Sequence, residues 1–271
     1  MNAKNIRENF LHKELNYAVN GCAFDAFKEV GIGFDETIYH KIFHHKLIQK
    51  GLKAEYKPPV YVEYFGKNIV ELEVDEIVEK KILVELKCIR KDFIPDNYAQ
   101  ILTYLKVTGM TLGLLVNFGL HKVATKRVLY QPDFIKNRRQ WDDDFYETFS
   151  EKPLVDKLVE LIYKVDKALG PSYLSKIYKT ALIIELNQNG IEFNPKTTLT
   201  ILASGHEFPD FEIDFWLIEP SFLLGILAGN ERPRTYDFLR MRSYLKKLNL
   251  HHGVIAFWSR KNLQLYGIYE S

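Results

Sequence analysis

The chain has 271 residues, of which 46% are hydrophobic, so it can form one large packed domain or two domains of ordinary size. Its 37 Lys and Arg nearly balance its 35 Asp and Glu. This balance excludes a protein that coats nucleic acid through overall positive charge. A polyanionic substrate would have to be bound by local basic patches and metal ions.

The sequence carries few signals for targeting or for disulfide formation. No apolar run reaches the roughly 18 to 20 residues that a membrane-spanning helix needs, and the polar start MNAKNIRENF has no apolar signal segment behind it. Cys22 and Cys88 have no CxxC partner, so both are expected to be reduced, and neither indicates zinc. The sequence therefore predicts a cytoplasmic protein that does not bind a membrane.

The first half of the chain alternates between helical and strand patterns. Helix signals are an N-cap residue, apolar positions at near-helical spacing and a terminating glycine, and strand signals are short apolar or alternating runs between turn residues. Their order predicts an α/β fold in which helices flank a mixed sheet. The expected elements are a helix between Asp35 and Gly51, strands at 60–66, 69–79 and 80–88, a helix at 95–108 and a strand at 112–119.

The second half repeats the first. Residues 30–56 align with 168–195, and the later segment 113–118 (GLLVNF) matches 253–258 (GVIAFW) after one inserted residue. A repeat of this length indicates two copies of one fold, which often pack as an internal pseudo-dimer. The predicted organisation is a first domain at 1–135, a charged linker at 136–154 and a second domain at 155–271.

Three charged residues lie within apolar strands of the first copy. Glu85 and Lys87 share one face of their strand, and Asp75 on the preceding predicted strand can pair beside Glu85. Adjacent carboxylates repel each other unless a cation such as Mg²⁺ joins them, and Lys87 would then stand next to a metal-bound water. The alternative is a solvent-exposed hairpin whose charges form weak cross-strand ion pairs. This stretch alone leaves both open.

Four motifs in order extend the pattern over most of the first copy. Asp75 followed by Glu85-Leu86-Lys87 resembles the core of the PD-(D/E)XK nuclease superfamily, and residues 33–39 (GFDETIY) resemble the signature of its GxxExxY family. Residues 100–106 and 113–119 extend the resemblance. The implied fold is two tandem restriction-endonuclease-like domains.

The resemblance also implies a site. Mg²⁺ or Mn²⁺ would be held by Asp75, Glu85 and the backbone carbonyl of Leu86, and Glu36 would complete the acidic cluster. Lys87 would be the catalytic lysine. Gln100 on the second helix would support the site.

Neighbouring side chains carry weaker expectations. Tyr104 and Lys106 are candidate contacts to nucleic acid, although for Tyr104, as for Tyr39, packing at the edge of the core is an equal alternative. His40 and His44 lie four residues apart on the first helix, but no third metal ligand follows at useful spacing, so both are predicted to be helix-surface residues.

The second copy lacks most of the charged set. Only Asp75 keeps its type, as Asp214, and the second domain is therefore predicted to be degenerate. Its Arg-rich stretch, with Arg240 and Arg242, is a candidate nucleic-acid surface, and a solvated helix face is the alternative. The residues opposite Glu36, Glu85, Lys87 and Gln100 are Ser175, Gly225, Leu227 and Arg240.

These patterns lead to one functional hypothesis and a rival. The hypothesis is a metal-dependent nuclease that hydrolyses phosphodiester bonds with its first domain, DNA being the expected substrate and the second domain being structural or nucleic-acid-binding. The rival is a non-catalytic module for nucleic-acid binding or protein interaction that retains the fold. The intact charged set favours the first, whereas the balanced charge and the degenerate second copy favour the rival.

Overall fold

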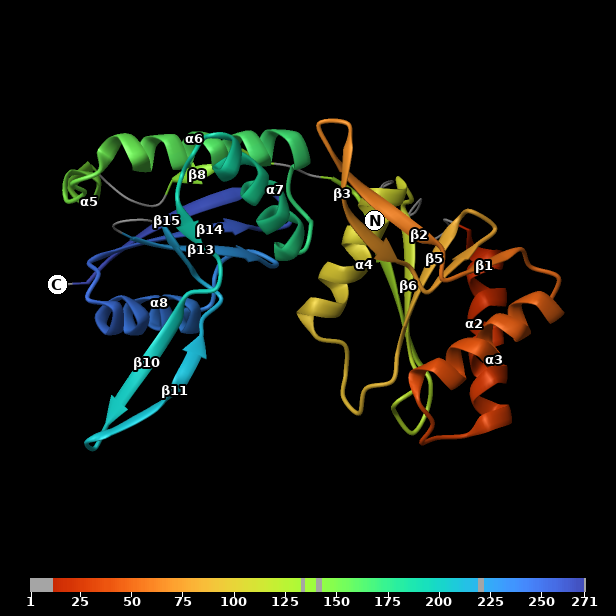
Figure 1. Ribbon diagram of the computed structural model, residues 1–271. Coiled ribbons are helices and arrows are strands. Elements are labelled where there is room, and N and C mark those ends of the chain that lie inside the picture. The colour runs from red at the N-terminus through yellow and green to blue at the C-terminus, as the bar shows by residue number, and fades with distance from the viewer. Residues whose placement is uncertain (1–11, 133–134, 140–142, 219–221, 271) are drawn as a thin grey trace, which may run out of the picture. The chain divides into compact units, whose positions relative to one another are not determined.

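The computed structural model describes residues 12–132, 135–139, 143–218 and 222–270. The chain divides into two compact units, each with its own sheet and helices (Figure 1). Unit 1 comprises Met1–Glu63 and Val70–Pro132, and unit 2 comprises Tyr64–Ile69 and Asp133–Ser271. Within the described ranges, no helix is both long enough and apolar enough to cross a membrane.

The first half of the chain places two helices before its strands and one between them. The helices are α2 (Lys13–Val30), α3 (Glu36–Gln49) and α4 (Pro95–Thr108). The strands are β1 (Ala54–Tyr56), β2 (Pro59–Tyr64), β3 (Lys67–Glu73), β4 (Glu76–Val78), β5 (Ile82–Lys87), β6 (Leu112–Asn117) and β7 (Ala124–Leu129).

Five of these strands form a mixed sheet in the order β1-β4-β5-β6-β7, and β2 and β3 form a separate two-stranded sheet. The central pair β5 and β6 is parallel, and the other pairs of the large sheet are antiparallel. A parallel neighbour requires a crossover connection, which α4 supplies. Strand β5 therefore lies inside the sheet, and its residues are shielded on both edges.

The core of unit 1 lies between the sheet and the helix pair α2 and α3. Tyr39 of α3 is fully buried, and its ring stacks on Phe118 with centroids 4.7 Å apart. Its hydroxyl donates a hydrogen bond of 2.6 Å to the carbonyl oxygen of Gly31, which joins the end of α2 to α3. The ring thus belongs to the core, in agreement with the packing alternative for Tyr39.

Unit 2 follows the same order of elements. Its helices are α5 (Asp143–Glu147), α6 (Lys152–Leu169), α7 (Ser175–Gln188) and α8 (Thr235–Leu248). Its strands are β8 (Arg138–Arg139), β9 (Phe193–Asn194), β10 (Thr198–Ala203), β11 (His206–Glu212), β12 (Trp216–Ile218), β13 (Phe222–Ala228), β14 (His252–Trp258) and β15 (Leu263–Tyr269).

The large sheet of unit 2 has the order β8-β15-β14-β13-β12-β9, so five of its strands repeat the order of unit 1 from β9 to β15. The parallel pair is again central, β13 with β14. Tyr178 occupies the place of Tyr39, since its ring stacks on Trp258 at 4.1 Å and its hydroxyl bonds the carbonyl oxygen of Gly170 at 2.8 Å. Two mixed sheets flanked by helices confirm the predicted fold class.

Local predictions succeeded where caps and breakers mark an element. Helices α3 and α4 coincide with the predicted helices. Helix α2 was missed, although Val19, Cys22, Ala23 and Ala26 are buried at helical spacing. These residues are mostly small and differ little in hydrophobicity from their neighbours, so the helical period is weak.

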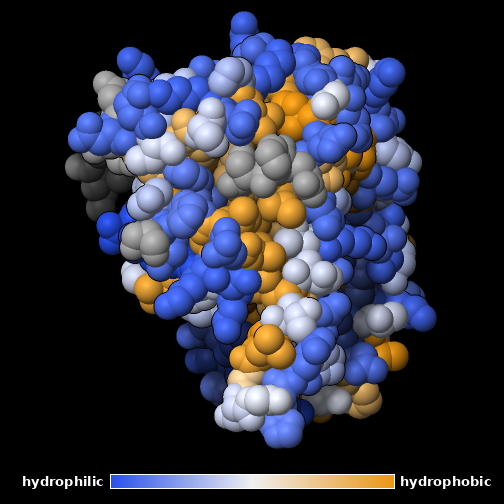
Figure 2. Space-filling view, turned by 60° about the vertical axis from the view of Figure 1, so that its left-hand side comes forward, coloured by the Kyte–Doolittle hydropathy of each residue, from blue (hydrophilic) through white to orange (hydrophobic). Residues whose placement is uncertain are grey.

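The hairpin of β10 and β11 leaves apolar side chains at the surface. Among the described residues, the exposed large apolar ones in these two strands are Ile201, Leu202, Phe208 and Phe211. Figure 2 shows apolar residues at the surface among hydrophilic ones on one face.

Gly119 provides a test of the packing behind β5. A Cβ at this position would lie 2.4 Å from the Ile89 nitrogen and 2.6 Å from the Cys88 carbonyl carbon, and backbone cannot move aside as a flexible side chain can. Gly119→Ala should lower the free energy of unfolding by about 1 to 3 kcal/mol in urea denaturation. Gly21→Ala is the control, because a Cβ there meets nothing within 4 Å inside α2 and should stabilise by about 0.5 to 1 kcal/mol. Equal stability of Gly119→Ala and the wild type would contradict this account.

Candidate active site of the first domain

The two faces of β5 differ in chemistry. Ile82 and every second residue after it point into the core under α2 and α3. Glu85 and Lys87 point to the opposite face, where α4 lies: Leu83 on this face pairs with Gly113, and a Cβ on Gly113 would meet Ile101 of α4 at 2.6 Å. The alternation predicted from the sequence is therefore present, and both charged groups lie between sheet and helix.

Glu85 is the most deeply buried of the predicted site carboxylates, with 2% of its surface exposed. Lys87 Nζ donates to Glu85 Oε1 at 2.5 Å. The second oxygen, Oε2, is buried and has no hydrogen-bond partner among the described residues. A buried carboxylate with one unsatisfied oxygen is costly, so this group is ready to accept a cation or a further donor.

Asp75 reaches the same place from a bend. It precedes the first residue of β4 rather than lying within a strand, which differs from the expectation of a strand position. Its Oδ2 accepts a hydrogen bond of 2.7 Å from the backbone N–H of Leu86, and Glu76 pairs with Val84, so the register brings Asp75 opposite Glu85.

Glu36 joins the site from the first turn of α3. Its Oε2 accepts a hydrogen bond of 3.1 Å from the backbone N–H of Cys88, directly after the end of β5. The helix N-terminus favours a negative charge there. Glu36, Asp75, Glu85 and Lys87 thus converge, as the sequence predicts, on the last residues of one strand.

Gln100 and Tyr104 come from α4. Gln100 Nε2 donates to the Tyr104 hydroxyl at 3.0 Å, in keeping with their spacing of one helical turn. Tyr104 is only 6% exposed, which leaves its ring little surface for stacking on a base, and Lys106 is half-buried.

The electrostatics tie these groups together. Burial first, and then the charge of Asp75, raise the pKa of Glu85 to about 8 against the attraction of Lys87. For Lys87, burial alone would lower the pKa, but the attraction of Glu85 and the other carboxylates outweighs it and raises the pKa. Burial and the charge of Glu85 raise the pKa of Tyr104 to about 12. Perturbed groups gathered in one place are typical of functional sites.

Two histidines and a glutamate behind the site were not anticipated. His40 is 2% exposed, so its interpretation as a helix-surface residue was wrong, while His44 is half-buried. Both contact the buried carboxylate of Glu76. No local pattern indicates this contact, because Glu76 is more than 30 positions further along the chain.

The second copy fills the equivalent space with other chemistry. A Cβ on Gly225, the counterpart of Glu85, would lie 3.3 Å from the ring of Phe215. Arg240, opposite Gln100, forms an ion pair with Asp214, and its guanidinium lies 5.0 Å from the Phe215 ring centroid. An aromatic ring and a tethered arginine thus stand where the first copy has Glu85 and Gln100.

Both candidate arginines of the second copy have acidic partners. Arg242 lies 3.9 Å from Glu270 and its side chain is 58% exposed, whereas that of Arg240 is 19% exposed. Arg242 is therefore the more accessible of the two for a polyanion.

The residues present can be tested against the metal that the superfamily implies. Among the described residues, no group of three or more His, Cys, Asp and Glu has the arrangement of a metal site. The unpartnered Oε2 of Glu85 beside Asp75 nevertheless fits a hard cation, which prefers carboxylate oxygens. Glu85 and Asp75 would hold such an ion.

Comparison with known families gives the class of the protein. A model of the PD-(D/E)XK nuclease superfamily matches the chain twice, over residues 13–128 and 152–264. These stretches make up most of the sequence, so the protein belongs to the PD-(D/E)XK nuclease superfamily. The two matches also agree with a tandem duplication.

Other comparisons add little detail. No curated protein matches the sequence. Five chains of solved structures do, among them one described as "Crystal structure of SSO0001", with 22% identity and a TM-score of 0.31 over 36% of this chain. The match spans half of that protein's length.

The raised pKa of Glu85 has a consequence for stability in metal-free protein. Since the folded pKa of about 8 lies above the ordinary value of 4.5, the group's favourable contribution is complete below pH 4.5 and is lost as pH rises through 8. Glu85→Gln should therefore become more stable relative to the wild type as pH rises across this window. Thermal unfolding in EDTA at pH 5, 7 and 9 measures the difference, and a constant difference would contradict the burial of an ionisable Glu85.

Proposed function

We propose that the first domain is a metal-dependent nuclease that hydrolyses phosphodiester bonds in nucleic acid, with DNA as the substrate. One observation carries the proposal. The copy that keeps Glu85 and Lys87 also buries them beside Asp75 with an unsatisfied carboxylate oxygen, and the other copy fills the same space with a ring and an ion pair. A solvent-facing hairpin would not bury these charges.

In this function each residue of the site has its own role. Asp75, Glu85 and the Leu86 carbonyl would hold Mg²⁺ or Mn²⁺, and Glu36 would complete the acidic cluster. The ion supplies a lower pKa for bound water and offsets negative charge on the phosphate. Lys87, held by Glu85, positions the attacking water or stabilises the charge that develops on phosphorus.

Gln100 and Tyr104 support this arrangement. Their mutual hydrogen bond orients the neutral tyrosine hydroxyl, which lies close enough to Glu85 for the charge of Glu85 to raise the pKa of Tyr104. We assign both a positioning role at the α4 side of the site. Lys106, two residues beyond Tyr104 on α4, is proposed as a contact to the nucleic-acid backbone.

The finer assignments complete the proposal. Residues 33–39 (GFDETIY) are the basis for proposing the GxxExxY subfamily. The proposed first domain is residues 1–135, the linker is 136–154 and the second domain is 155–271. A cytoplasmic location is proposed from the two free cysteines, Cys22 and Cys88. The second domain is proposed to be structural or nucleic-acid-binding.

A non-catalytic nucleic-acid or protein-interaction module is the second candidate. The balanced charge of 37 basic and 35 acidic residues favours it, as does the loss of Glu85 and Lys87 in the second copy. The two candidates differ in turnover, which can be measured directly.

Cleavage of plasmid and oligonucleotide substrates in Mg²⁺ or Mn²⁺ tests the nuclease. Glu85→Ala removes a metal ligand and Lys87→Ala removes the cation next to the scissile phosphate, so each should slow cleavage by about 100-fold or more. Initial rates at saturating metal are the measurement.

Two exposed residues of the same region serve as matched controls. Glu71→Ala in β3 and Lys81→Ala in the turn before β5 remove the same charges from the surface and should leave cleavage unchanged. Cleavage that persists in Glu85→Ala and Lys87→Ala would show a different site or a contaminating nuclease. A wild type that neither binds Mn²⁺ in calorimetry nor cleaves would favour the module.

Nucleic-acid binding by the second domain is tested by charge reversal. Replacing Arg240 and Arg242 by Glu should weaken DNA retention and reduce the dependence of affinity on salt, because phosphate contacts release counterions. Replacing Lys157 and Lys167 on α6 by Glu makes the same total charge change as a control. Binding that stays equally tight and equally salt-dependent in the Arg variants would exclude this surface.

A further inference from the structure

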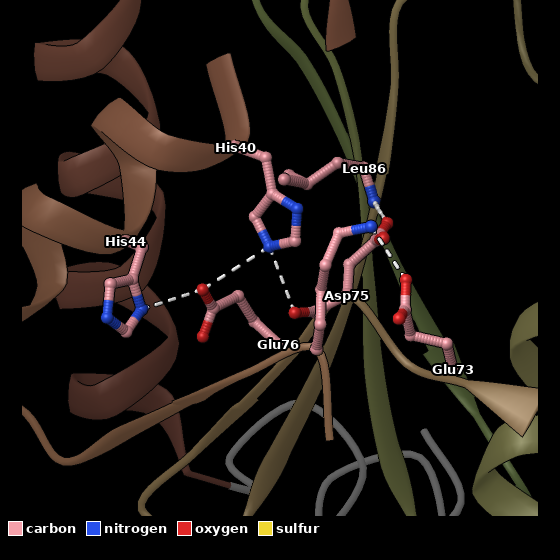
Figure 3. Close-up of polar contacts among 7 residues, drawn as sticks. His40, His44, Glu73, Asp75, Glu76 and Leu86 are labelled. Carbon is pink, nitrogen blue, oxygen red and sulfur yellow. Dashed lines mark hydrogen bonds and ion pairs between the residues drawn. The ribbon is translucent and has the colours of Figure 1, made fainter. Parts of the chain in front are cut away.

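A buried polar cluster lies behind Asp75 (Figure 3). His44 Nδ1 is 2.8 Å and His40 Nε2 is 3.4 Å from Glu76 Oε1, and Glu76 has no exposed surface. The ring of Tyr56 covers both imidazoles, at centroid distances of 4.3 Å from His40 and 5.2 Å from His44. The cluster joins α3 to the start of β4 and is closed off from solvent on the His40 side.

His40 connects this cluster to the candidate metal ligand. Its Nε2 is 2.9 Å from the backbone carbonyl oxygen of Asp75. A carbonyl oxygen can only accept, so Nε2 carries the hydrogen. The same oxygen also accepts the backbone N–H of Lys57 at 2.9 Å, which occupies both of its lone pairs. The main chain of Asp75 is thus held on one side while its side chain is held by Leu86 on the other.

Glu76 fixes the direction of His40. A carboxylate with no exposed surface is retained only where donors surround it, and here the two imidazoles face one of its oxygens. Its Oε2 has no hydrogen-bond partner among the described residues. The donor to Glu76 is therefore His44, on the side that faces α3, and the His40 ring lies between that carboxylate and the Asp75 carbonyl to which it donates.

Comparison with the second copy indicates which of these contacts belong to the fold and which accompany the site. Lys179 occupies the position of His40 on α7, and its Nζ donates to the carbonyl oxygen of Asp214 at 3.3 Å. In contrast, the first residue of β12, equivalent to Glu76 in strand register, is Trp216, and the residue opposite His44 is Ile183. A donor to the aspartate carbonyl occurs in both copies, whereas Glu76 and His44 occur only with Glu85 and Lys87.

We propose that His40, oriented by Glu76 and His44, is a positioning residue that fixes the bend at Asp75 so that its carboxylate stays on the Leu86 amide beside Glu85. The inference rests on the proposed function for the use of this geometry in metal binding. The placement of Asp75 itself is a property of the metal-free protein and can be measured without catalysis.

The first measurement is hydrogen exchange of the Leu86 amide in EDTA. In His40→Leu the bend loses its side-chain donor, so the Leu86 amide should exchange faster than in the wild type, relative to the Leu114 amide of β6. His40→Lys copies the donor of the second copy and should return exchange toward the wild-type rate. His45→Leu is the matched control, because His45 is exposed on the same helix, α3, and its loss should change nothing.

The second measurement is metal dependence. The Mn²⁺ concentration that gives half-maximal cleavage should rise about 10- to 100-fold in His40→Leu, the usual effect of losing a residue that orients a metal ligand, and should recover in His40→Lys. KM for DNA should stay close to the wild-type value, because His40 lies behind the site. Calorimetric Mn²⁺ binding gives the same comparison without turnover.

The outcomes separate this inference from the proposed function. Unchanged Leu86 exchange and unchanged Mn²⁺ dependence in His40→Leu, or equal defects in His40→Leu and His40→Lys, would overturn the positioning role and leave the nuclease intact. A wild type that neither binds Mn²⁺ nor cleaves would overturn the nuclease instead. If His40→Leu does not fold, Glu76→Gln keeps the size of the side chain and carries the same expectation of faster Leu86 exchange.

Discussion

The burial of the Glu85 carboxylate on an interior strand is the constraint on which the candidate site depends. Taking a charged carboxylate out of water costs several kcal/mol unless cations and donors replace the water. Lys87 satisfies one oxygen only, and Asp75 adds a second negative charge nearby. The parallel pairing of β5 with β6 keeps the strand in the middle of the sheet, and α4 lies over the face that carries Glu85.

The duplicated fold shows which interactions build the scaffold and which serve the site. The stacked tyrosine and its bond to a glycine carbonyl occur in both units, through Tyr39 with Gly31 and Tyr178 with Gly170. The order of the central strands is also shared. Of the charged groups of the site, only Asp75 has a counterpart of the same type in unit 2, Asp214. The fold therefore persists without Glu85 and Lys87, as expected when a hydrophobic core supplies most of the stability.

Sequence patterns predicted the parts of the structure that local rules determine. Caps and breakers located α3 and α4, and the two-residue period of β5 placed Glu85 and Lys87 on one face. They did not predict that His40 is buried, because its partner Glu76 lies far along the chain and only the packing of α3 on β4 brings them together. Tertiary contacts of this kind leave no periodic signal in one sequence.

The Phe215 ring beside Gly225 limits how the second half could regain the charged residues of the first. A glutamate introduced at Gly225 would meet that ring, whose place in the core leaves no room for a longer side chain, and it would face the guanidinium of Arg240. Rebuilding the charged set of the first copy would require replacement of Gly225, Leu227 and Arg240 and removal of the Phe215 ring, so no single substitution achieves it. The interiors of the two halves thus differ at several positions that touch one another and can change only together.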